Sequence, residues 1–157
     1  MKINRVEEKD NGEWECSVTG KGESGDYEVG AGKVQVVVAV PPAEVHLEVE
    51  GQQVTGPISL NLDSETQLFV DCVATGARPA AEFAWYIADT KLNANIKVRE
   101  EAGEDGKMTY TSTLEYNAAP MHSGSLLKCE VNHMGYTMVQ IEDRSNVAES
   151  QLNLKCK

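Results

Sequence analysis

The amino-acid sequence predicts an all-β fold, a sandwich or barrel built from short strands. Short runs in which apolar and polar residues alternate recur along the 157 residues, and Gly, Pro, Asn and Asp bound these runs, as expected for half-exposed strands joined by turns. An apolar period of 3.6 residues, which would indicate helices, is not convincing anywhere. The composition, 41% hydrophobic and 25% charged, is that of an ordinary globular protein. Little helix and no disordered or collagen-like segment is therefore expected.

The N-terminal quarter of the chain contains two candidate strands, residues 12–18 and 33–40, in which apolar and polar side chains alternate. Residues 20–32 between them carry five of the 13 glycines, which suggests a mobile hairpin loop. Pro41 and Pro42 follow, and a strand must end there because proline cannot donate a ladder hydrogen bond. We therefore expect a domain boundary at this short, semi-rigid spacer.

Strand signals resume after the two prolines and continue almost to the end of the chain. Turns are expected at residues 75–79 and 101–107, and one helical turn near residues 118–123. The expected strands are residues 44–50, 58–62, 67–74, 82–88, 96–100, 108–116, 125–133 and 148–154.

Charge and hydropathy exclude several partners. Fourteen basic residues against 25 acidic ones give a net charge of −11. Binding to a phosphate backbone needs a basic surface, so we expect no nucleic-acid partner and no adsorption to anionic lipid. No apolar run approaches the length that spans a bilayer, and residues 1–5 lack the apolar core of a signal peptide.

No motif for catalysis, cofactor or metal binding stands out, so we expect a non-enzyme without a cofactor. The sequence has no G-x-S-x-G, H-E-x-x-H or phosphate-loop motif. Its three histidines are scattered, and its four cysteines lack the C-x-x-C spacing of a zinc site. The adjacent His122 and Ser123 are read as a polar turn, and the acidic residues 101–105 as a solvated hairpin rather than a calcium loop.

Cys72, Trp85 and Cys129 lie on three separate predicted strands, and the turn Thr75-Gly76-Ala77-Arg78-Pro79 leads towards Trp85. This arrangement resembles the immunoglobulin superfamily, in particular its C2-type and I-type domains. The resemblance implies an immunoglobulin-like β-sandwich with a disulfide between Cys72 and Cys129. It also implies that Trp85 packs against that bridge in the core.

The segment Asp10-Asn11-Gly12-Glu13-Trp14-Glu15-Cys16 is similar to the corner before strand F of such domains, with Trp14 where a tyrosine is usual. We therefore expect residues 1–40 to be the F and G strands of a truncated domain, residues 41–43 a linker, and residues 44–157 one complete domain. Cys16 and Cys156 are expected to be orphans within this chain. Cys156 is either a free thiol or paired outside the fragment.

The corner of the second domain has Leu127 in place of the tyrosine, which resembles nectins and the insect adhesion protein fasciclin III. The resemblance implies an extracellular cell-adhesion or recognition module at the plasma membrane, acting by protein–protein binding and as a spacer. Its partner would be an immunoglobulin-superfamily protein, homophilic or heterophilic. Alternatives are an intracellular, sarcomeric-type scaffold module and the ectodomain of a receptor enzyme.

Five residues are candidates for contact with a partner protein. Three of them would lie on the outward face of the first pair of strands, and two tyrosines would be exposed on the second domain, where aromatic side chains suit an interface. Each also fits a plain solvent-facing position. The candidates are Glu13, Glu15, Gln35, Tyr86 and Tyr136.

Overall fold

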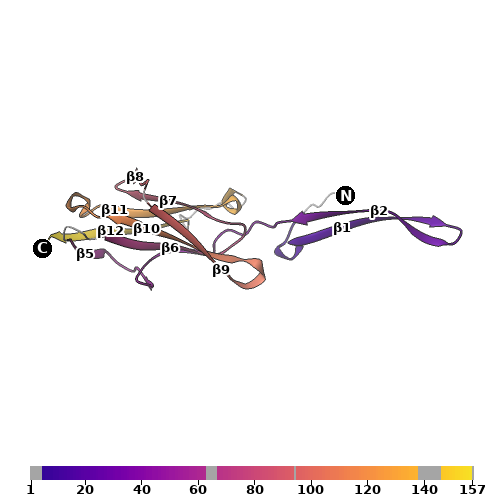
Figure 1. Ribbon diagram of the computed structural model, residues 1–157, viewed down its shortest axis with the longest axis horizontal. Coiled ribbons are helices and arrows are strands. Elements are labelled where there is room, and N and C mark those ends of the chain that lie inside the picture. The colour runs from indigo at the N-terminus through magenta and orange to yellow at the C-terminus, as the bar shows by residue number, and fades with distance from the viewer. Residues whose placement is uncertain (1–4, 63–66, 94, 138–145, 157) are drawn as a thin grey trace. The chain divides into compact units, whose positions relative to one another are not determined.

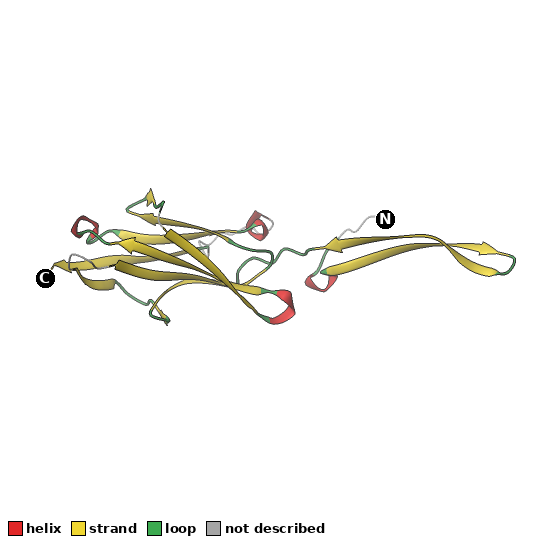
Figure 2. Ribbon diagram, viewed as in Figure 1, coloured by secondary structure: helices red, strands yellow, loops and turns green. Residues whose placement is uncertain are grey.

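A computed structural model describes residues 5–62, 67–93, 95–137 and 146–156 (Figure 1). Strands dominate, joined by loops and four short 3-10 helical turns (Figure 2), and no α-helix occurs among the described residues. The all-β prediction is confirmed. The strands are β1 (Gly12–Gly22), β2 (Gly25–Val36), β3 (Glu44–Val49), β4 (Gln52–Gln53), β5 (Ile58–Leu62), β6 (Gln67–Ala77), β7 (Glu82–Ile87), β8 (Thr90–Lys91), β9 (Asn95–Ala102), β10 (Met108–Asn117), β11 (Leu126–Asn132) and β12 (Val147–Cys156). The 3-10 turns are η1 (Glu8–Asp10), η2 (Glu104–Gly106), η3 (Pro120–His122) and η4 (Met134–Thr137).

The chain divides into two compact units, Met1–Ala39 and Val40–Lys157, called unit 1 and unit 2 below. Unit 1 consists of η1 and a two-stranded antiparallel ribbon of β1 and β2. Unit 2 contains the ten remaining strands in two sheets of five.

The expectation of a mobile loop over residues 20–32 is wrong. β1 and β2 pair through this region as far as Gly22 and Gly25, with one irregularity after Val18. Glycine is compatible with this pairing because the hydrogen bonds between the strands involve only backbone groups. The missing side chain also leaves space for a neighbour: the Tyr27 ring comes within 2.8 Å of the position that a Cβ on Gly20 would take.

The two sheets of unit 2 form a sandwich. One sheet has the strand order β4-β3-β6-β10-β9 and the other β5-β12-β11-β7-β8. All neighbouring strands are antiparallel except β5 and β12. The two-residue strands β4 and β8 were not expected, because two residues are too few to show alternation.

A disulfide bond between Cys72 and Cys129 joins the sheets through the core. Cys72 lies in β6 and Cys129 in β11, and both are fully buried. Alternate residues of a strand point to the same face, so the cysteines share the inner faces with apolar neighbours. The pairing that the family resemblance implied is confirmed. The neighbours on these two strands are Leu68, Val70, Ala74, Leu127 and Val131.

Trp85 is the largest fully buried side chain and lies beside Cys129 in the register of β7 and β11. Its indole Nε1 donates a buried hydrogen bond of 3.0 Å to the Ser112 hydroxyl of β10, in the opposite sheet. An unpaired indole N–H in this core would carry a desolvation cost. Ser112, itself fully buried, therefore allows the Trp85 indole to be buried without an unpaired N–H.

The beginning of unit 2 is bonded to the end of β6. Val40 and Arg78 each donate their backbone N–H to the carbonyl of the other, at 2.7 and 2.9 Å. Ala43 donates to the carbonyl of Thr75 at 2.8 Å. β6 thus continues beyond residue 74, where a turn was expected, and the segment around Pro41 lies along the sandwich.

The buried His133 connects two loop segments at this end of unit 2, residues 79 and 135. Nε2 of His133 lies 3.0 Å from the carbonyl oxygen of Pro79, which follows a cis peptide bond, and the Gly135 N–H donates to Nδ1 at 2.9 Å. Because a carbonyl only accepts and an amide N–H only donates, Nε2 carries the proton. A Cβ added to Gly135 would lie 2.8 Å from Cδ of Pro41 and 2.9 Å from Nδ1 of His133.

Gly135→Ala should destabilise unit 2, because the methyl group overlaps both Pro41 and His133 at a site that is already packed. We expect the free energy of unfolding, from urea denaturation, to fall by about 1–3 kcal/mol. Gly56→Ala is the matched control, since a Cβ there meets nothing within 4 Å, and its effect should stay within about 0.5 kcal/mol. Equal stability of the two variants would contradict the tight packing at Gly135.

Candidate interaction surfaces

One face of the ribbon in unit 1 gathers three of the residues selected from the sequence. Glu13 lies opposite Gln35, and Glu15 lies opposite Lys33. Lys33 also forms an ion pair with Glu13, with 2.8 Å between Nζ and Oε1. These side chains are exposed, so the ribbon carries a charged surface that two strands build together.

The other face of the ribbon is apolar and open. Trp14 lies opposite Val34, and exposed fractions are 38% for Trp14, 58% for Val34 and 57% for Val18. Nε1 of Trp14 donates to the carbonyl of Asp10 at 2.7 Å. Although Trp14 replaces the tyrosine of the family pattern, it holds the chain before β1 by a hydrogen bond of its own.

The outer face of the β5-β12-β11-β7-β8 sheet carries a tyrosine, Tyr86 of β7. Tyr86 follows the buried Trp85 and therefore points outwards, but it is half-buried, less exposed than the sequence suggested. Lys128 of β11 lies over its ring, with Nζ 4.6 Å from the ring centroid. The register places Lys91, Tyr86, Lys128 and Glu149 side by side across four strands, and we call these four residues the Tyr86 row.

Tyr136 is also less exposed than expected. It lies in η4, half-buried, and packs against the core cluster, with its ring edge-on to His133 at 6.1 Å between centroids. Its hydroxyl is buried and has no hydrogen-bond partner among the described residues. Burial raises the pKa of this hydroxyl. Tyr136 therefore supports the end of the sandwich, whereas Tyr86 is placed on an outer face.

The chain has two further cysteines, Cys16 and Cys156. Cys16 is an exposed free thiol on β1, opposite Gly32. The backbone of Cys156 ends β12 beside β5, and its side chain lies outside the described part of the chain.

Leu127, which stands where the family usually has a tyrosine, is fully buried and packs in the core cluster.

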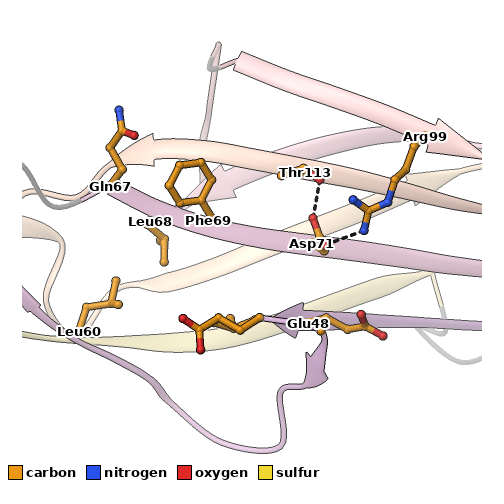
Figure 3. Close-up of a pocket in the computed structure, with 11 residues that line it drawn as sticks. Glu48, Leu60, Gln67, Leu68, Phe69, Asp71, Arg99 and Thr113 are labelled. Atoms are coloured by element: carbon orange, nitrogen blue, oxygen red, sulfur yellow. Dashed lines mark hydrogen bonds and ion pairs between the residues drawn. The ribbon is translucent and has the colours of Figure 1, made fainter.

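A hollow of about 330 Å³ lies on the other sheet, beside Leu60 and the half-exposed Phe69 (Figure 3). Asp71 of β6 points towards β10 and β9 there. It accepts a hydrogen bond from the Thr113 hydroxyl and pairs with Arg99, whose Nη2 lies 3.0 Å from Oδ2. The carboxylate is thus already paired within the sheet.

The described residues include no group of three or more His, Cys, Asp or Glu side chains placed to hold a metal ion. Likewise, no described helix has the length and apolarity needed to cross a bilayer.

The sequence did not single out Lys128 and Arg99, because only the pairing register reveals which side chains they contact, Tyr86 and Asp71.

The family model for CD80-like C2-set immunoglobulin domains matches residues 46–137, more than half of the chain. The chain belongs to this immunoglobulin family. The expected immunoglobulin family is therefore confirmed. The chain is similar to a curated relative, Cell adhesion molecule 2 of Xenopus tropicalis, which is 23% identical over 137 residues. The match covers 87% of this chain and 28% of the relative, so the chain spans about a quarter of that protein.

Solved structures show the same fold. The structure of Rst D1-D2 superposes with a TM-score of 0.73 at 22% identity, covering 96% of this chain and 66% of that chain. The ectodomain of mouse nectin-like molecule 4 gives a TM-score of 0.55 at 16% identity, covering 85% of this chain and 40% of that one. Bovine butyrophilin gives 0.54 at 14% identity, covering 92% and 56%.

Proposed function

We propose that this immunoglobulin-superfamily chain is a non-catalytic recognition module that binds another protein through the outer face of the β5-β12-β11-β7-β8 sheet. The observation that carries the proposal is the Tyr86 row, an aromatic ring beneath a lysine on an outer sheet face. Tyrosine is enriched at interfaces because it offers a large apolar ring together with a polar end. The partner is an immunoglobulin-superfamily protein, either another copy or a relative.

The charged side chains beside Tyr86 can contribute both to the affinity and to the specificity of binding. Lys128 keeps only 24% of its side-chain area exposed and lies 3.9 Å from Asp89, measured from Nζ to Oδ1. A lysine held over a ring is already better ordered than a free one, so its side chain loses less conformational entropy when a partner binds it. Glu149 at the end of the row adds a negative group, which favours a partner of matching charge pattern.

We also propose an extracellular position at the plasma membrane, which two observations support. The chain resembles a cell adhesion molecule, and its core contains a disulfide, a bond that persists mainly in oxidising compartments. The disulfide favours this proposal over an intracellular scaffold module.

We further propose that unit 2 folds alone and also serves as a spacer that carries unit 1. Its disulfide, core cluster and both sheets lie within Val40–Lys157. The ribbon of unit 1 has only two strands, and a single hairpin is marginally stable in water at best. The residues Glu13, Glu15 and Gln35 would then add a second, charged contact surface.

Tyr86→Ala should weaken binding to a partner that uses this face. The chain would be coupled to beads for an aggregation assay and also tested against a panel of secreted immunoglobulin-superfamily ectodomains. For the pairs found, we expect the dissociation constant to rise by about thirtyfold or more, as for an aromatic hot spot of 2 kcal/mol or more.

Phe69→Ala is the matched control for Tyr86→Ala. Phe69 is 52% exposed and lies on the other sheet, so its loss should leave binding unchanged. Absence of binding in both assays, or equal losses in the two variants, would contradict the proposed surface.

A chain that begins at Val40 should keep the stability of unit 2. It retains the Val40–Arg78 pairing and the whole core, so the free energy of unfolding followed by Trp85 fluorescence should change by less than about 0.5 kcal/mol. Loss of the cooperative transition would show that unit 2 depends on the ribbon and would contradict the division.

A further inference from the structure

Strand β9 is an open edge of unit 2. It is the last strand in the order β4-β3-β6-β10-β9, and all eight of its residues are exposed. An edge strand presents a row of backbone N–H and C=O groups to solvent, which is a template for another strand. The opposite edge, β4, has only two residues, so β9 is the long edge of this sheet.

Two apolar side chains on β9 are also open to solvent. Ile96 and Val98 are 37% and 56% exposed, although they lie on the same face as the fully buried Leu114 and Ser112 opposite them. An edge strand that exposes branched apolar residues gains from a neighbour, because a neighbour removes their area from water.

The charges of β9 are divided along its length. Lys97 and Arg99 precede Glu100 and Glu101. A lysine on an edge ordinarily discourages pairing by repelling a similar strand. Here an antiparallel copy can place Lys97 of one strand opposite the acidic half of the other, so this pair of charges favours pairing.

Arg99 is already engaged within its own sheet. It reaches across β10 to Asp71 of β6 (Figure 3), and its register partner is Thr111. This interaction directs the guanidinium away from the open edge. It leaves Lys97 as the cation that can meet a second strand.

We propose that two copies of this chain associate through their β9 strands, paired antiparallel about a two-fold axis at Arg99. Lys97 of each copy then lies opposite Glu101 of the other, Ile96 lies opposite Ala102, and Val98 lies opposite Glu100. The two Arg99 residues lie opposite each other at the axis, where each guanidinium is paired with Asp71 of its own sheet. This register keeps like faces together, because opposite residues in an antiparallel pair point to the same side. The contact is isologous and closes at two copies, and it joins two five-stranded sheets into one.

This association goes beyond the proposed recognition surface and does not rest on it. The Tyr86 row lies on the other sheet, so Tyr86→Ala should leave pairing through β9 intact. The two proposals therefore fail separately.

Sedimentation equilibrium of the full chain tests the pairing. The wild-type chain should show a monomer–dimer equilibrium, and Lys97→Glu should raise its dissociation constant by about tenfold, since both symmetry-related pairs change from attraction to repulsion. The exchanged variant Lys97→Glu/Glu101→Lys restores opposite charges and should recover dimerisation. A zero-length carbodiimide cross-linker on mixed ¹⁴N and ¹⁵N chains should join Lys97 of one isotope to Glu101 of the other.

Lys155→Glu is the control, because Lys155 is an exposed lysine on β12 of the other sheet and lies outside the Tyr86 row, and it should leave the dimer unchanged. A wild-type chain that stays monomeric up to about 1 mM would overturn the proposal, because a dissociation constant of that size would already yield dimers. An exchanged variant as weak as Lys97→Glu, or an equal loss in Lys155→Glu, would overturn it as well.

Discussion

The covalent bridge between Cys72 and Cys129 is the constraint on which unit 2 depends. It links β6 of one sheet to β11 of the other at a point where both side chains are fully buried. Trp85 lies beside it on β7 and bonds to Ser112 on β10, so one covalent bond and one hydrogen bond connect the sheets at adjacent positions. A domain of this size has a modest apolar core, and a cross-link across that core restricts the unfolded chain most effectively because it closes a long loop.

The outer surfaces follow from this core through the two-residue period of strands. Because Trp85 and Cys129 point inwards, Tyr86 and Lys128 must point outwards and meet. In the other sheet the inward Cys72 leaves its neighbour Asp71 outside, where it holds Arg99 of the edge strand. The proposed recognition surface and the open edge are thus on different sheets, so the two proposed contacts do not compete for the same strands. An adhesion module that binds one protein through a face and another copy through an edge would combine recognition with clustering.

Much of this architecture could be predicted from alternation and from the order of Cys72, Trp85 and Cys129. What could not be predicted depends on register. The contact of Lys128 with Tyr86 and of Arg99 with Asp71 joins residues that are distant in sequence, and alternation states which face a residue takes but not which neighbour it meets. The paired region at residues 20–32 was missed because glycines signal turns more often than ladders. Tyr136 was expected to be exposed because a loop residue usually is, yet it packs over the end of the core.

The most direct test of the central role of the bridge is the free energy of unfolding of a Cys72→Ala/Cys129→Ala chain. Urea denaturation followed by far-ultraviolet circular dichroism would compare it with the oxidised wild-type chain. If the bridge determines how the sheets hold together, the double variant should lose about 2–5 kcal/mol. A loss below about 0.5 kcal/mol, the range of a neutral surface substitution, would contradict this account.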